Sequence, residues 1–236
     1  MAFDYDGTHD LETSLQDSFG EAILHGVVVS NLASFVAREM ALSEEQCHNL
    51  AIAGMLHDIG KLRLRSYVYE EKEAKLNIDE LRYVRLHPSL GYAILKEHGY
   101  TKEILTAVLY HHENVDGSGY PEGLEGIEQT MFTRILHVAD VYDALVSRRP
   151  YKEPYSPYEA SEYLMGGCGI MFDRHVVATL LKYVPLYPKG KQVCLSDGRV
   201  GIIMENSDYH NLRPVVKLFD GTILDLADRE NLNITV

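Results

Sequence analysis

Apolar side chains recur at helical spacing along most of the chain and alternate at strand spacing near its C-terminus. From Ser14 to Met40 they recur every three or four positions with no intervening proline, which predicts one long helix. Ser43 with Gln46 three residues later forms a capping-box pattern, which predicts a second helix that ends at His57-Asp58. The chain is therefore expected to begin with two helices, the second ending in a histidine and an aspartate.

The same spacing continues beyond a charged, tyrosine-rich stretch at 62–75, which is expected to be a loop or short helical pieces. Pro88 should end or kink a helix at His87, and Gly99 should close the next one. Thr101 should cap a helix that ends in His111-His112. Helices are predicted over 77–87, 89–98, 101–112, 130–145, 158–165 and 173–183.

Beyond a linker at 185–190 the pattern becomes strand-like. Short β-prone runs at 193–195, 200–204, 215–219 and 222–226 are separated by Asp-Gly and Asn-containing turns. The sequence therefore predicts a mainly α protein, with a helical bundle over residues 1–185 and a small antiparallel β module over 190–236. The module shows no residues that indicate chemistry.

Composition narrows the function. The 236 residues carry a formal net charge of −13, which disfavours attraction to a DNA backbone. No apolar stretch approaches a membrane span and the acidic N-terminus does not resemble a signal peptide, so a cytoplasmic protein without a membrane contact is expected. Three scattered cysteines argue against disulfides and a cysteine-based zinc site, whereas eleven histidines indicate nitrogen and oxygen ligands if a metal binds.

Two pairs on the first helices are candidate ligands. Glu21 and His25 lie four residues apart and so share one helix face, although such a spacing is also typical of a surface pair. His57 and Asp58 can bind one metal only where the backbone turns, and Gly60 is expected to supply that turn. A local hydrogen bond at a helix end is the alternative for this second pair.

Later helices add further candidates. Tandem His111 and His112 point about 100° apart on a helix, so both can bind metal only if they serve different ions or the helix ends there. One core and one exposed histidine is the alternative. Asp140 and Asp143 share one face of a strongly apolar helix, where carboxylates are costly to bury unless they are paired or bind metal.

Two loops complete the set. Asp116-Gly117-Ser118-Gly119-Tyr120-Pro121 is a glycine-rich loop whose backbone can approach a ligand closely. Arg148-Arg149-Pro150-Tyr151-Lys152 is a basic cluster in an acidic chain, either a solvated turn or a source of charge for a phosphate.

Potential metal ligands thus lie on or at the ends of helices of one bundle: Glu21, His25, His57, Asp58, His87, His111, His112 and Asp140. These eight side chains are more ligands than one ion can bind. They suit two or three ions of a metal that prefers imidazole and carboxylate, such as iron or manganese.

These motifs together resemble the HD-GYP branch of the HD superfamily. The resemblance rests on His57-Asp58-Ile59-Gly60-Lys61, on His111-His112-Glu113 with the Gly119-Tyr120-Pro121 loop, on the segment 137–145 and on Arg149-Pro150-Tyr151-Lys152. It extends from about Glu21 to Val184 and implies an HD-type helical bundle.

The resemblance implies a metal-dependent phosphodiesterase that opens cyclic di-GMP to linear pGpG and then cuts it to GMP. It implies a two-iron centre held by His57, Asp58, His87, His111, His112 and Asp140, with Asp58 as the bridge. Glu21 and His25 match positions that hold a third ion in some members. A hydroxide held between the ions would be the nucleophile.

The resemblance also assigns substrate contacts. Lys61 would neutralise a phosphate oxygen or assist the leaving group, and Arg149 and Lys152 match basic positions that contact substrate. Tyr120 and the Gly119 backbone would shape the pocket. Asp143 would orient a ligand or contact substrate.

The sequence departs from the family pattern in two ways, and several alternative functions stay open. Arg174 stands where the family commonly has a proline, outside the expected metal site, and no sensor domain precedes the helices. Another cyclic dinucleotide such as cyclic GMP-AMP, or a mononucleotide, could be the substrate, and the Gly-Tyr-Pro loop disfavours the mononucleotide. A receptor or adaptor that binds a diguanylate cyclase or another regulatory partner is disfavoured by the complete ligand set.

Overall fold

The computed structural model describes residues 8–64, 78–148, 153–182, 184, 187, 189–207 and 210–236, of which residues 8–19, 21, 206, 207 and 210–212 are described by their backbone alone. The chain divides into two compact units, and each is described by itself. One comprises Met1–Ala144 with Cys168–Val176, and the other comprises Leu145–Gly167 with Val177–Val236.

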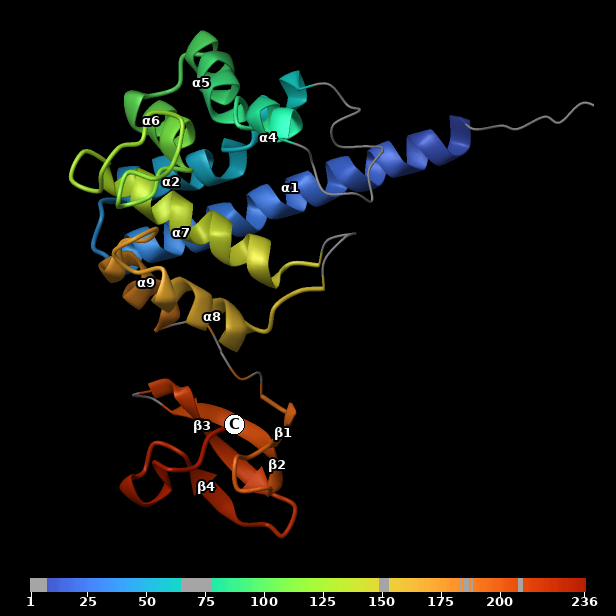
Figure 1. Cartoon of the computed structure of the whole chain (residues 1–236), viewed down its shortest axis with the longest axis vertical. Coiled ribbons are helices and arrows are strands. Elements are labelled where there is room, and N and C mark those ends of the chain that lie inside the picture. Colours follow the sequence, from blue (N-terminus) through green and yellow to red (C-terminus); the bar gives the residue numbers. More distant parts are fainter. Residues whose placement is uncertain are drawn as a thin grey trace, which may run out of the picture. The chain divides into compact units, whose positions relative to one another are not determined.

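The first unit is built on two packed helices, α1 (Thr8–Glu39) and α2 (Glu44–Leu56), as the sequence predicted (Figure 1). The capping box is present, because Ser43 Oγ accepts a hydrogen bond from the Gln46 N–H and the Gln46 side chain accepts one from the Ser43 N–H. The two helices approach closely at Gly54, where a Cβ atom would lie 2.7 Å from the Cα of Ser30. This contact fixes how α2 presents its C-terminal end.

Five further helices of the first unit follow α2 among the described residues, and their bounds agree with most of the predicted segments. They are η1 (Ile59–Arg63), α4 (Ile78–Val84), α5 (His87–Glu97), α6 (Lys102–Tyr110) and α7 (Met131–Val146). Gly99 has a φ of 77° and closes α5, as expected. Thr101 occupies the N-cap position of α6, but its side chain makes no capping hydrogen bond.

The expectation for His87 was wrong. His87 begins α5 instead of ending the preceding helix, which stops at Val84. Pro88 lies in the first turn of α5, where its missing N–H costs nothing and its fixed φ suits the helix. The proline therefore starts a helix here, and it places His87 at an N-terminus.

The core of the first unit is apolar and is shared by four helices. Its fully buried side chains include Val29 and Ala33 of α1, Leu50 of α2, Val108 of α6 and Ile135 of α7. Burial of such side chains from several helices holds their ends in fixed positions. The ends of α2 and α6 and the start of α5 carry the histidines described below.

The second unit contains α8 (Pro157–Gly166), the later part of α9 (Arg174–Leu181) and a four-stranded antiparallel sheet in the order β1-β2-β3-β4 (Figure 1). The strands are β1 (Gln192–Cys194), β2 (Val200–Ser207), β3 (His210–Leu218) and β4 (Ile223–Asp225), followed by η2 (Arg229–Asn231). The mainly helical fold with a C-terminal antiparallel sheet is therefore confirmed.

The sheet buries one apolar face, and Arg213 of β3 helps to hold the C-terminal segment. Val193, Ile203 and Val216 are buried on neighbouring strands. The guanidinium of Arg213 donates hydrogen bonds to the carbonyl oxygens of Leu226, Leu232 and Ile234. The domain boundary near residue 185 stays a prediction. Within the described residues, no helix combines the length and the apolar character that a bilayer crossing needs.

Candidate metal centre

Three buried histidines are locked in the same tautomer by backbone carbonyl groups that precede them in the chain. The Nδ1 atoms of His57, His87 and His111 lie 2.7 to 2.8 Å from the backbone carbonyl oxygens of the residues three positions earlier. A carbonyl oxygen only accepts, so each Nδ1 carries the hydrogen. In the neutral ring Nε2 therefore holds a lone pair, which is the atom that binds a metal.

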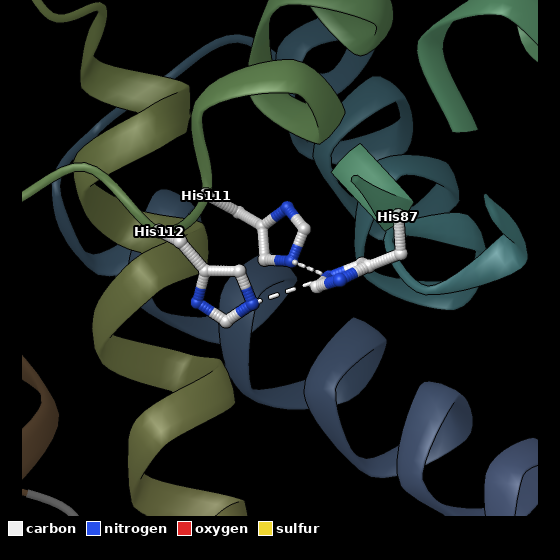
Figure 2. Close-up of side chains that lie close together, drawn as sticks. All are labelled: His87, His111 and His112. Atoms are coloured by element: carbon white, nitrogen blue, oxygen red, sulfur yellow. Dashed lines mark hydrogen bonds between the residues drawn. The ribbon is translucent and has the colours of Figure 1, made fainter. Parts of the chain in front are cut away.

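The ε-nitrogens of His87, His111 and His112 converge on one point, and these residues are called the histidine cluster below. Figure 2 shows the rings of His111 and His112 turned toward His87. The Nε2 atom of His87 lies 3.2 Å from the Nε2 atoms of both other rings. Because the fixed tautomers of His87 and His111 leave lone pairs facing each other, those two nitrogens cannot form a hydrogen bond without a further proton. A cation between them satisfies both.

Asp58 lies between the histidine cluster and a second set of ligands. Its Oδ1 atom is 3.3 Å from Nε2 of His87, whereas its Oδ2 atom is 3.5 Å from Nε2 of His57 and pairs with the ammonium group of Lys61. The two carboxylate oxygens therefore face different histidines. This arrangement allows one carboxylate to contact two ions.

The second set is completed by His25 and Asp140. Nε2 of His25 lies 3.1 Å from Oδ1 of Asp140, and the same oxygen is 3.5 Å from Nε2 of His57. The Nε2 atom of His57 is buried and has no hydrogen-bond partner in the described part of the chain. A buried Nε2 atom without a partner beside two carboxylates fits a metal site, because a cation there would contact all three groups.

Asp143 contacts the second set through the other ring nitrogen of His25, Nδ1. Its side chain is 2% exposed, and its Oδ2 atom lies 2.6 Å from Nδ1 of His25. A carboxylate that accepts from the far nitrogen of a histidine fixes the orientation of the ring. The contact is that of an orienting group.

The histidine cluster is kept uncharged by its surroundings. Burial lowers the pKa of His112 to about 3, and burial together with its histidine neighbours lowers the pKa of His111 well below its usual range. Neutral imidazole is the form that binds metal. The cluster therefore keeps its lone pairs available at neutral pH.

The carboxylates are held in their charged form. Burial alone would raise the pKa of Asp58, but His57, Lys61 and His87 hold it far below its usual range. Burial would lower the pKa of His25, yet hydrogen bonds with Asp140 and Asp143 outweigh this effect and raise it to about 9. The carboxylates of the second set therefore stay charged, and His25 holds a proton that a bound metal ion would have to displace.

Gly60 has a different role from the one expected. It does not adopt a positive φ, so it does not supply a left-handed turn. A Cβ atom at Gly60 would lie 1.9 Å from the carbonyl oxygen of His87 and 2.5 Å from the backbone nitrogen of Gly91. The glycine is required because η1 packs directly on the backbone of α5, which brings Asp58 within reach of His87.

The Gly-Tyr-Pro loop is folded onto the histidine cluster. A Cβ atom at Gly119 would lie 2.5 Å from the carbonyl oxygen of His112, and the Tyr120 N–H donates to that oxygen at 3.2 Å. The ring of Tyr120 stacks on the ring of His112, with centroids 4.8 Å apart. The close approach expected of Gly119 toward a ligand is therefore made to the chain's own backbone.

Glu113 anchors this loop and was not assigned a role from the sequence. It is fully buried, and its carboxylate accepts hydrogen bonds from the backbone N–H groups of Glu122, Gly123 and Leu124. An acid directly after two histidines and before a glycine-rich turn was the available signal. Its partners are backbone groups, which a pattern of side chains does not reveal.

His137 is a second buried group that the sequence did not single out as a site residue. Its Nδ1 atom donates to the carbonyl oxygen of His111 at 2.7 Å, and its Nε2 atom has no partner within the described residues. Its ring also packs on Phe172 at 5.1 Å. His137 therefore supports the backbone of a metal-facing histidine from α7.

The structure brings together seven of the eight expected ligands: His25, His57, Asp58, His87, His111, His112 and Asp140. They form overlapping groups of three whose ligand atoms lie within 4.8 Å of one another. The Glu21 side chain and the residues Arg149 and Lys152 lie outside the description. α6 ends at Tyr110, so the tandem histidines leave the helix and both can turn inward.

Comparison with known proteins agrees with this geometry. The model of the HD domain family matches residues 11–176. The chain is 36% identical over 197 residues to cyclic di-GMP phosphodiesterase PA4108 of Pseudomonas aeruginosa, covering 83% of this chain and 47% of that protein. It is 33% identical over 164 residues to 3'3'-cGAMP-specific phosphodiesterase 3 of Vibrio cholerae, covering 70% of this chain and 35% of that protein.

A solved structure shares the fold. Bd1817, an HD-GYP-type protein from Bdellovibrio bacteriovorus, superposes with a TM-score of 0.57 at 19% identity, covering 67% of this chain and 51% of that one. The chain spans about half the length of the curated relatives it matches or less. The likeness in structure supports the helical fold around the histidines.

Proposed function

The chain belongs to the HD domain family, and on this premise we propose that it is a metal-dependent phosphodiesterase for a cyclic dinucleotide, with cyclic di-GMP as its substrate. The observation that carries the proposal is the convergence of imidazole lone pairs and carboxylates in one buried site. Relatives named for cyclic di-GMP and for cyclic GMP-AMP share this part of the chain. The products would be linear pGpG and then GMP.

The histidine cluster would hold one ion together with Asp58. His57 and Asp140 would hold the next, with Asp58 shared between the two. Iron is proposed, with manganese as the alternative, because both accept imidazole and carboxylate ligands. When bound, such ions lower the pKa of a water nucleophile and offset charge on the phosphate.

A third ion is proposed at His25 with Glu21. His25 lies within the same group of ligand atoms as His57 and Asp58, which supports its part in the centre. In this assignment Asp143 orients His25 and does not contact substrate, because it is 2% exposed and lies 2.6 Å from Nδ1 of that ring. Glu21 is the residue that decides between two ions and three.

Other residues would act on the phosphate and the bases. Lys61 has a side chain that is 35% exposed and lies against the Asp58 carboxylate, so its charge is available at the edge of the centre. It would neutralise a phosphate oxygen or assist the leaving group. Arg149 and Lys152 are proposed to bind the substrate, and Tyr120 to border its pocket.

One substrate alternative and one functional alternative remain candidates. Cyclic GMP-AMP is favoured by the likeness to the Vibrio cholerae relative named for it. A receptor that binds a cyclic dinucleotide or a cyclase partner without cutting is disfavoured, because the described ligands are all in place.

One experiment separates these possibilities. The protein loaded with iron or manganese under reducing conditions is incubated with cyclic di-GMP and with cyclic GMP-AMP, and linear dinucleotides are resolved from mononucleotides by chromatography. Faster conversion of cyclic di-GMP supports the proposal, and faster conversion of cyclic GMP-AMP supports the other substrate. Binding without conversion of either would contradict the enzyme assignment.

A further inference from the structure

The guanidinium group of Arg85 lies against the Gly-Tyr-Pro loop, and Arg85 is not one of the proposed metal ligands. The guanidinium carbon of Arg85 lies 5.0 Å from the ring centroid of Tyr120. The same ring stacks on His112, a member of the histidine cluster, at 4.8 Å. One aromatic ring therefore connects a positive charge with a metal-facing imidazole.

The charge of Arg85 is not neutralised by a carboxylate among the described residues. Three other described arginines are paired in that way: Arg82 with Asp79, Arg134 with Asp173 and Arg199 with Asp197. Arg85 is exposed and contacts an aromatic face instead. In a chain with a net charge of −13, an arginine with no acid partner among the described residues and next to the candidate metal site can bind an anion.

The position of Arg85 is set by the backbone that also sets His87. The Arg85 N–H donates to the carbonyl oxygen of Leu81 at 3.0 Å, which continues the last turn of α4. The His87 ring donates to the carbonyl oxygen of Val84 at 2.8 Å. One short turn therefore presents both the metal-facing imidazole and the guanidinium.

The stacked arrangement suits the recognition of phosphate. Contact with the ring face of Tyr120 restrains the guanidinium, and its N–H groups make no hydrogen bond to the described residues. A planar guanidinium binds two phosphate oxygens at once, which an ammonium group does not. Tyr120 thus prepares Arg85 to bind an anion at low entropic cost.

We propose that Arg85, held by Tyr120, binds the phosphate of the cyclic dinucleotide that is not being cut. A cyclic dinucleotide carries two phosphodiesters, and when one is at the metal centre the other lies outside it. Arg85 lies outside the set of converging ligands, one aromatic ring away from His112. This inference rests on the proposed function and adds a substrate contact to it.

The test compares Arg85→Ala with Arg82→Ala, a matched control on the same helical segment whose arginine is paired with Asp79. Arg85→Ala should raise KM for cyclic di-GMP about tenfold with a much smaller change in kcat, because a charge-assisted bidentate contact is lost. Arg82→Ala should change neither. Arg85→Lys should be intermediate, since it keeps the charge without the planar stack.

A second substrate separates substrate binding from damage to the centre. Bis(p-nitrophenyl) phosphate is a diester with a single phosphate, so its hydrolysis and the bound metal content should be the same in Arg85→Ala and the parent protein. The difference in KM for cyclic di-GMP between Arg85→Ala and the parent protein should also become smaller at about 1 M salt, because salt screens a contact between charges.

Several results would overturn the inference. Equal KM values for Arg85→Ala and Arg82→Ala would show that Arg85 does not contact the substrate. Equal losses on both substrates would make Arg85 a support of the metal centre. A KM difference that is insensitive to salt would assign Arg85 to a base edge and not to a phosphate. Absence of cyclic dinucleotide hydrolysis by the parent protein would instead defeat the proposed function, and this inference with it.

Discussion

Oε1 of Glu113 accepts a 2.9 Å hydrogen bond from the backbone N–H of Gly123, ten residues further along the chain. The same carboxylate also accepts from the N–H groups of Glu122 and Leu124. It thereby ties the segment after Tyr120 to the residue that follows the tandem histidines. The Gly-Tyr-Pro loop is held by this one buried acid at its end.

Glu113→Gln should therefore destabilise the protein by about 1 to 3 kcal/mol, because an amide group would face an N–H donor in a buried site. The free energy of unfolding in urea measures the change. Glu128→Gln is the matched control, since Glu128 accepts one backbone hydrogen bond at an exposed position. An equal effect of the two substitutions would show that Glu113 does not anchor the loop.

Gly60→Ala should disrupt the contact between η1 and α5. Its Cβ atom would meet the carbonyl oxygen of His87 at 1.9 Å, so one backbone must move and the separation of Asp58 from His87 must grow. We expect a loss of bound metal and of thermal stability. Metal analysis and calorimetry of the purified variant measure both.

Gly20→Ala provides the control for this substitution. Gly20 lies within α1, and a Cβ atom there would have nothing within 4 Å. Alanine favours a helix over glycine by up to about 1 kcal/mol, so this variant should be as stable as the parent or more stable. If Gly60→Ala retained full metal content, the tight packing of η1 would not be needed for the centre.

The Asp173 carboxylate makes a contribution to the stability of the fold that depends on pH. Burial alone would raise its pKa, but the N–H groups of Val176 and His175 and the guanidinium of Arg134 hold the pKa below its usual range. A lowered pKa in the folded state means that the carboxylate stabilises the fold above its unfolded pKa of about 3.9, and that this contribution is lost as the pH falls through the folded value.

Asp173→Asn should thus cost about 1 kcal/mol at neutral pH, and the difference from the parent should vanish in acid. Asparagine can still accept the backbone hydrogen bonds at the start of α9, so mainly the pairing with Arg134 is removed. Denaturant unfolding across the acid range measures the effect. A difference that stays constant with pH would show that the ion pair is not its source.

Glu21→Ala tests the number of ions. It should lower the bound metal by about one ion while the circular dichroism spectrum stays unchanged, because Glu21 is a charged residue proposed to act as a ligand and not as part of the apolar pattern of its helix. Elemental analysis of the reconstituted protein gives the count. An unchanged count would restrict the centre to two ions.

The elements that local patterns specify were predicted correctly. The capping box at Ser43 and Gln46 marked the start of α2, and Gly99 marked the end of α5, because each signal depends on neighbouring residues alone. Seven ligands could be named because histidines and acids at helix ends are visible in the sequence, and the family resemblance grouped them.

The remaining features depend on contacts between distant segments. Pro88 can end one helix or start the next, and the packing of α5 on η1 decides in favour of starting. Gly60 is required because the backbone of His87 packs closely against it. The proposed role of Arg85 depends on its contact with Tyr120, 35 residues further along the chain. Spacing along the chain contains no information about such neighbours.

Asp58 is proposed to join two metal ions in a centre that hydrolyses a cyclic dinucleotide. The most direct measurement is metal content and cyclic di-GMP turnover in the same preparations of the parent protein and Asp58→Ala. We predict at least two ions and conversion to linear pGpG in the parent, with fewer ions and no turnover in the variant. Full turnover by Asp58→Ala would contradict the claim.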